Sequence, residues 1–229
     1  ANSTLRYNRH ATTGNQDAFG AGLRIQRGNP LIEATRIYSN TVMAADSGDV
    51  FGAGIYIEDG SPRIVASWIY ENTATGSREG VGGGIAIAEG EPVIESSSIT
   101  TNTLAGSGDR QLKSGGGIGF MDDSDAEIRG CWIAGNRVDL IGGYAGGGGI
   151  GFASDAEASV IEQNVLYANY VEGPGWCEGG GIDAWEGNAV WVRNRSEERR
   201  VGKECRSRRS PEHNDKKAQV VIVTILTSA

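Results

Sequence analysis

Residues 82–103 read GGGIAIAEGEPVIESSSITTNT, and the whole chain repeats this unit. Its Gly-x-Gly-apolar start recurs at Gly20, Gly52, Gly82, Gly115, Gly147 and Gly179. The apolar residues that follow, at intervals of 32, 30, 33, 32 and 32 residues, are Leu23, Ile55, Ile85, Ile118, Ile150 and Ile182. A repeat of this length is typical of stacked supersecondary units, so we expect about six coils of a solenoid.

Within each repeat the apolar residues alternate with a period of two, as in Ile85-Ala86-Ile87, which indicates strands. A bend follows, and then a second inward apolar position is expected at Ile32, Ile64, Ile94, Ile128 and Val160. The third apolar position lies three residues before an Asn that recurs as Asn40, Asn72, Asn102, Asn136 and Asn169. We therefore predict an all-β solenoid with three short parallel strands per coil, ~4.8 Å apart along the axis.

The repeats GGGIAIAEGEPVIESSSITTNT and GAGIYIEDGSPRIVASWIYENT (residues 52–73) resemble the right-handed parallel β-helix repeat family, in which pectate-lyase-like solenoids are found. The resemblance covers about residues 5–194 and implies the fold and an extracellular or cell-surface location. Relatives with this fold include polysaccharide lyases, glycoside hydrolases and adhesins, so the fold does not select an activity. Because the chain starts within a repeat, we expect a fragment that is truncated at both ends.

The composition changes after Asn194. Residues 195–229 carry nine basic and five acidic residues, a net charge of +4, whereas residues 1–194 carry 12 and 24, a net charge of −12. Residues 195–213 resemble the in-frame translation of a sequencing adapter, with departures at Arg209 and Glu212. We therefore predict two parts, residues 1–194 with the repeats and residues 195–229 as a non-native or disordered tail. The alternative is a basic arm for nucleic acid, but the tail has no aromatic residues for stacking, and we expect no nucleic-acid partner.

Five aromatic residues flank the third inward position, and alternation predicts that they share one outer face of the solenoid. They are Tyr38, Trp68, Tyr70, Trp132 and Tyr167. A row of exposed aromatic rings is suited to stacking on sugar rings. The alternative is that these side chains only shield the sheet or pack under a loop.

Acidic residues recur just after the first strand of each repeat. The row consists of Asp59, Glu89, Asp122, Asp123, Asp155 and Glu186. Carboxylates on neighbouring coils could bind calcium or act as an acid and base pair on a sugar, or they could simply be solvated bend residues. No metal site of the His/Cys type is expected, because His10 is the single histidine before the tail.

The recurring Asn residues, the loops after them and the two cysteines also lead to expectations. We expect the row of recurring Asn residues, here called the Asn file, to have a structural role in which stacked amides hydrogen-bond at a tight bend. Loops after each Asn, such as residues 41–51, should carry specificity. Cys131 and Cys177 lie on different coils, and the sequence leaves their pairing open. No apolar run reaches the ~20 residues of a membrane-spanning helix.

The sequence favours a non-catalytic binding or adhesive scaffold outside the cell, with glycans as the expected ligand and the remaining coils of a longer chain as partners. The main alternative is a fragment of a polysaccharide lyase or glycoside hydrolase that uses surface carboxylates, and a purely structural spacer is a third. An enzyme should gather three carboxylates, or carboxylates with an Arg or Lys, in one groove. Arg24, Arg63 and Arg129 are the basic candidates.

Overall fold

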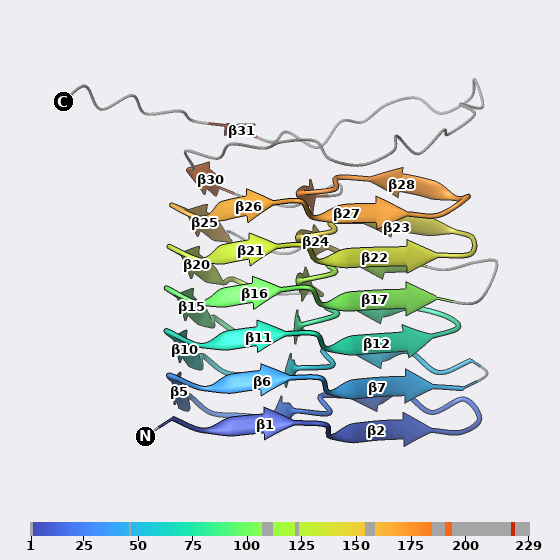
Figure 1. Cartoon of the computed structure of the whole chain (residues 1–229), viewed down its shortest axis with the longest axis horizontal. Helices are drawn as coiled ribbons and strands as arrows, with labels where there is room; N and C mark the ends of the chain where they lie inside the picture. Colours follow the sequence, from blue (N-terminus) through green and yellow to red (C-terminus); the bar gives the residue numbers. More distant parts are fainter. Residues whose placement is uncertain are drawn as a thin grey trace.

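The chain forms a parallel β-solenoid whose coils stack from the N-terminal end upward in Figure 1. The computed structural model describes residues 2–45, 47–106, 112–121, 124–153 and 159–184, and for residues 191–193 and 221–222 the backbone alone. Every strand pairing is parallel and joins a strand to its counterpart in the next coil. The all-β solenoid predicted from the repeats is therefore confirmed.

Each coil contributes to five sheets, which we name A to E. Sheet A consists of β1 (Thr4–Arg6), β6 (Arg36–Tyr38), β11 (Trp68–Tyr70), β16 (Ser98–Thr100), β21 (Trp132–Ala134) and β26 (Val165–Tyr167). Sheet B consists of β2 (Arg9–Thr12), β7 (Thr41–Ala44), β12 (Thr73–Gly76), β17 (Thr103–Gly106), β22 (Arg137–Leu140) and β27 (Tyr170–Glu172). Sheet C consists of β3 (Ala18–Phe19), β8 (Val50–Phe51), β13 (Gly80–Val81), β18 (Leu112–Ser114), β23 (Tyr144–Gly146) and β28 (Trp176–Glu178).

The other two sheets follow the glycine-rich start of each repeat. Sheet D consists of β4 (Leu23–Ile25), β9 (Ile55–Ile57), β14 (Ile85–Ile87), β19 (Ile118–Phe120), β24 (Ile150–Phe152) and β29 (Ile182–Ala184). Sheet E consists of β5 (Leu31–Glu33), β10 (Arg63–Val65), β15 (Val93–Glu95), β20 (Glu127–Arg129), β25 (Val160–Glu162), β30 (Trp191–Arg193) and β31 (Val221–Ile222).

The expectation of three strands per coil was wrong, because the predicted loop after each Asn contains two more strands. In the second coil the stretch of residues 41–51 holds β7 and β8 with a short turn between them. Alternation in these strands is carried by small residues such as Val42, Ala44 and Val50, which are buried. Because these side chains are small, the period-two pattern is weaker here than in the other three strands, whose inward residues are larger.

The side chains that follow each Gly-x-Gly start form a single axial file. Leu23 pairs with Ile55, Ile55 with Ile85, and the same register continues through Ile118 and Ile150 to the next coil. This file is part of a central interior column of isoleucines that also contains Phe120 and Phe152. The rings of these two phenylalanines stack with centroids 4.4 Å apart. The continuous column buries apolar surface that one coil alone could not cover.

One inward position differs from the prediction. Ile128 pairs with Ile161, which is fully buried, and Val160 instead pairs with Glu127 on the outer side. The fifth repeat therefore carries one additional residue before this strand, and a shift of one residue moves a side chain to the opposite face.

The Asn file is a buried hydrogen-bonded ladder between sheets A and B, as predicted. The Asn72 Nδ2 donates to Asn102 Oδ1 at 2.9 Å and to the carbonyl of Ile37 at 3.0 Å, and Asn102 repeats the pattern toward Asn136. The left-handed backbone falls on the preceding residue, with φ of 55° at Glu71. The asparagine thus closes the bend through its amide, not through its own backbone conformation.

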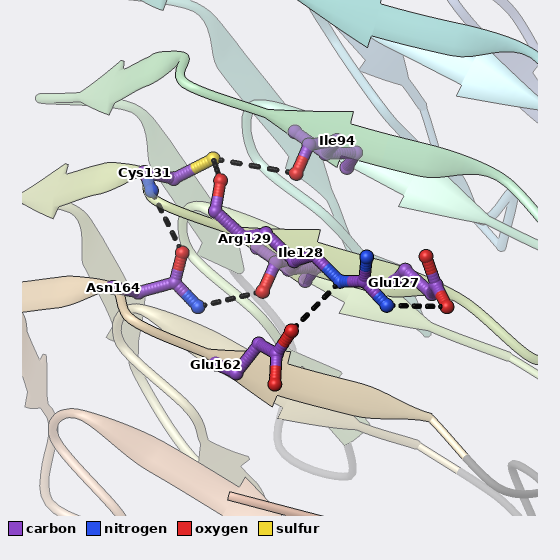
Figure 2. A network of polar contacts seen from close by, with 7 residues as sticks. All are labelled: Ile94, Glu127, Ile128, Arg129, Cys131, Glu162 and Asn164. Carbon is purple, nitrogen blue, oxygen red and sulfur yellow. Dashed lines mark hydrogen bonds and ion pairs between the residues drawn. The ribbon is translucent and has the colours of Figure 1, made fainter. Parts of the chain in front are cut away.

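A second ladder closes the bend between sheets E and A with mixed residue types. Cys131 Sγ donates to the carbonyls of Arg129 at 3.3 Å and Ile94 at 3.5 Å (Figure 2). The Cys131 N–H donates to Asn164 Oδ1 at 2.8 Å. Ser67 and Ser97 occupy the same position in earlier coils and donate through their hydroxyl groups. A side chain that can donate to a carbonyl is what this bend requires.

Sheets C and D meet in a corner where large and small side chains alternate between the two sheets. A Cβ atom at Gly119 would lie 2.4 Å from Val81 Cγ1, and one at Gly151 would lie 2.4 Å from Ser114 Oγ. In an earlier coil the same corner is filled by Phe19 and Tyr56, with ring centroids 4.9 Å apart. The glycines therefore give the sheets the room to approach each other.

Candidate functional site

The outer face of sheet A gathers all five predicted aromatic residues. In β6, β11, β21 and β26 the central residue points inward, and the flanking residues point outward. Trp68, Ser98 and Trp132 form one outward column, and Tyr38, Tyr70, Thr100, Ala134 and Tyr167 belong to the other. Sheet A lies beside sheet B on the side of the solenoid that faces the viewer in Figure 1. The prediction that the aromatic residues share a face is confirmed, whereas their role as a binding site stays a prediction.

The aromatic residues of the first coils form one group. The rings of Tyr38 and Tyr70 stack with centroids 4.7 Å apart and planes inclined by 5°. Tyr7 meets Tyr38 edge-on at 5.9 Å. The Arg36 guanidinium lies 5.2 Å from the Trp68 ring centroid, at the distance of a cation–π contact. This group presents aromatic faces and guanidinium groups side by side.

The later coils hold a second group. Trp132 and Tyr167 lie 6.2 Å apart and are 47% and 43% exposed. Ser98 separates Trp132 from Trp68, which is 41% exposed. Two strand spacings place these tryptophans about 10 Å apart along the axis. The short side chains of the middle strand leave the two aromatic groups as separate platforms.

Sequence reasoning missed three residues of this face, namely Arg6, Tyr7 and Arg36. The Arg6 guanidinium donates to the Tyr38 hydroxyl at 2.9 Å. Tyr7 has φ of 56° at the residue before Asn8, where the chain bends, and this conformation turns its side chain out to 69% exposure. Arg6 was detectable from its register with Tyr38, but the orientation of Tyr7 depends on the bend.

The predicted acidic row is described only in part. Asp59 and Glu89 lie at the same bend of neighbouring coils, next to Gly60 and Gly90, whose backbones approach closely. Asp59 pairs with Arg27 at 3.8 Å, and Glu89 is exposed. Asp122, Asp123, Asp155 and Glu186 lie outside the described residues. A calcium or catalytic role for this row stays a prediction.

Comparison with known families identifies the fold. A family model described as a right-handed beta helix region matches residues 1–196 of the chain.

The chain belongs to the right-handed β-helix family.

Searches of curated proteins and of solved structures found no match. The resemblance inferred from the repeats is thereby confirmed at the level of the fold. Family membership in the β-helix proteins selects no reaction and no ligand.

The β-helix also contains a buried carboxyl group that the sequence did not indicate. Asp183 is 8% exposed and accepts a hydrogen bond of 2.7 Å from the Tyr144 hydroxyl. Burial raises the pKa of Asp183, the nearby Glu178 raises it further, and the Tyr144 hydrogen bond opposes both effects. Burial first, and the charge of Asp183 second, also raise the pKa of Tyr144. The Tyr144 hydroxyl is therefore the donor to the carboxylate, and Trp176 lies in register beside Tyr144.

The basic candidates of the enzyme alternative lie in ion pairs on the surface of the solenoid. In the described ranges no set of three His, Cys, Asp or Glu side chains is arranged to hold a metal ion. The three basic candidates are each paired with carboxylates, Arg24 with Glu58, Arg63 with Glu95, and Arg129 with Glu127 and Glu162. These pairs lie on different coils, and Figure 2 shows the pair network of Arg129.

The sequence left open whether Cys131 and Cys177 form a disulfide. Cys131 is a free thiol, so it is not joined to Cys177. Burial raises the pKa of the Cys131 thiol to about 11, since a thiolate would be poorly solvated there.

Among the described residues there is no helix of the length and apolar character needed to cross a membrane.

Proposed function

We propose that the outer face of sheet A is a non-catalytic carbohydrate-binding surface of an extracellular or cell-surface scaffold. The observation that carries the proposal is the set of five aromatic residues on one regular sheet face, three of which are more than 40% exposed. Pyranose rings present apolar C–H faces that pack on aromatic rings, while their hydroxyl groups remain solvated or bonded at the edges.

The geometry supports an extended polymer that runs along the solenoid axis. The platforms of Trp68 and Trp132 lie two coils apart, with Ser98 between them, so one sugar chain can contact both. The parallel strands hold these side chains in register without loop movement, so little conformational entropy is lost on binding. A regular sheet is a rigid base for such a surface.

A glycan array followed by affinity electrophoresis tests the proposal. We expect the chain to bind at least one polysaccharide, and Trp68→Ala combined with Trp132→Ala to weaken binding about 30-fold. Each lost stacking contact contributes ~1 kcal/mol, and two such contacts give that ratio.

The matched control is Trp176→Ala, which removes a tryptophan of 58% exposure from sheet C. We expect this variant to bind within twofold of the parent. Equal binding by the sheet A variant and the parent would support the structural spacer instead. Release of shorter sugars from the bound polymer would support the lyase or hydrolase alternative.

A further inference from the structure

The arginines of the described chain divide into two sets. Six of them pair with carboxylates within 4.0 Å, namely Arg24, Arg27, Arg63, Arg78, Arg129 and Arg137. Within the described residues no such ion pair forms at Arg6, Arg9 or Arg36. The chain as a whole has 29 acidic residues and 21 basic ones, so its net charge is negative.

These three arginines lie close together in the fold. Arg6 ends β1, Arg9 begins β2, and Arg36 begins β6, which pairs with β1. All three side chains are exposed, and the strands are neighbours at the N-terminal end of the solenoid in Figure 1. The strands thus place the three arginines on neighbouring positions at one end of the sheet A face and the adjoining strand of sheet B.

Sheet A is also the sheet whose strands lack acidic residues. Each of the other four sheets carries at least one carboxylate within its strands, for example Asp139 in sheet B, Glu178 in sheet C, Asp183 in sheet D and Glu95 in sheet E. The strands of sheet A contain none. Glu71 follows β11 at the bend, where it accepts a hydrogen bond from the Ser39 hydroxyl. An anion over sheet A therefore meets little repulsion from the strands beneath it.

Uncharged side chains contact the three guanidinium groups without neutralising them. Arg6 lies 5.4 Å from the Tyr7 ring centroid and donates one N–H to the Tyr38 hydroxyl. Arg36 lies over Trp68, and Arg9 Nη2 contacts Met43 Sδ at 3.6 Å. A guanidinium that rests on a ring keeps N–H groups at its edge for a carboxylate or sulfate.

We propose that Arg6, Arg9 and Arg36 bind the anionic substituents, sulfate or carboxylate, of the glycan that stacks on sheet A. This inference rests on the proposed function and adds the chemical class of the ligand. The anionic part of the polymer lies over the first two coils, and the less charged sugar faces lie on Trp132 and Tyr167. The exposed carboxylates of sheets B and E repel the same polymer, so the charge pattern also favours sheet A over those two faces.

A set of polymers with one backbone tests the inference by affinity electrophoresis. Dextran, carboxymethyl dextran and dextran sulfate differ only in their substituents. We expect the parent chain to bind one or both anionic polymers at least tenfold more tightly than dextran, and added salt to weaken that binding. The two anionic polymers distinguish carboxylate from sulfate recognition.

The variant Arg6→Gln/Arg36→Gln should lose at least tenfold more affinity for the anionic polymer than for dextran. The matched control is Arg27→Gln/Arg63→Gln, which removes two positive charges from exposed ion pairs elsewhere and should bind within twofold of the parent. Equal losses in the two variants, or no preference of the parent for charged dextran, would overturn the inference. A single-stranded oligonucleotide that competes as well as the anionic dextran would overturn the assignment to glycans.

The two proposals fail in distinguishable ways. If the Trp68/Trp132 variant loses affinity for a neutral glycan while the arginine variant matches its control, the glycan surface stands and the anion site falls. If the arginine variant loses affinity while the tryptophan variant binds like the parent, an anion site exists without the stacking surface.

Discussion

At the scale of single residues, the asparagine ladder closes each coil onto the next. Asn102 is fully buried, donates to the Ile69 carbonyl and to Asn136 Oδ1, and accepts from the Asn72 amide and backbone N–H groups. All four groups lie away from solvent, so each must find its partner within the protein.

We expect Asn102→Ala to lower the free energy of unfolding by about 3 kcal/mol or more, because several buried polar groups lose their partners at ~1–3 kcal/mol each. Urea denaturation followed by circular dichroism measures the change. Asn29→Ala is the control, since Asn29 is exposed and accepts one hydrogen bond from the Ser61 N–H. Similar losses in both variants would contradict a special role for the buried ladder.

Lys113 is a residue whose burial no sequence pattern indicated. It is fully buried in β18, where its Nζ donates to the Arg78 carbonyl at 2.8 Å. Gly80 makes the space, because a Cβ there would lie 2.9 Å from Nζ. Burial lowers the pKa of Lys113 to about 7, although Asp49 and Glu79 act in the opposite direction.

The free energy of unfolding should therefore rise with pH above about 7. Between that value and the ordinary lysine pKa of 10.5, the unfolded chain holds a proton that the native chain lacks. We expect Lys113 to contribute a rise of roughly 3 kcal/mol between pH 7 and pH 10. Urea titrations at several pH values should show this rise for the parent and not for Lys113→Met, and identical slopes would contradict the burial of a neutral amine.

At the scale of elements, the packing between sheets C and D depends on where glycine occurs among the outward-facing residues of sheet D. Gly119 of sheet D faces Val81 of sheet C, and Gly151 faces Ser114. In these two coils the strands approach closely because a side chain of sheet C meets a glycine of sheet D.

Gly119→Ala should destabilise the protein by about 3 kcal/mol or more, because its methyl group would overlap two backbone atoms, Gly82 N at 2.5 Å and Ser114 O at 2.6 Å. Gly180→Ala is the matched control, since its nearest neighbour would lie at 3.2 Å. Thermal unfolding compares the two variants. A melting temperature of Gly119→Ala equal to that of Gly180→Ala would show that the corner can open.

At the scale of the whole molecule, each coil is held by the coils above and below it. The interior column runs from Leu5 to Ile182, the Asn ladder from Asn8 to Asn169, and the second ladder from Thr35 to Asn164. Sheet E continues to β30, and β30 pairs with β31 through Trp191 with Val221 and Val192 with Ile222. This pairing is the described link between the repeats and residues 195–229.

We expect a chain that ends at Asn194 to unfold within about 2 °C of the full chain, since two backbone pairs add little to a solenoid of this size. Differential scanning calorimetry of both chains measures the difference. A decrease of 5 °C or more would show that residues 195–229 complete the fold, contrary to the prediction that they are a separate tail.

The sequence by itself determined the repeat, the axial file from Leu23 to Ile182, the Asn ladder and the shared face of the five aromatic residues. These features follow from period-two alternation and a fixed repeat length, which act locally. Only the tertiary structure decided the two extra strands per coil, the inward position of Ile161, the burial of Lys113 and Asp183, and the carboxylate partners of six arginines. Those outcomes depend on which side chains the coil-to-coil register brings together, and a one-residue shift at a bend changes that register without altering the repeat.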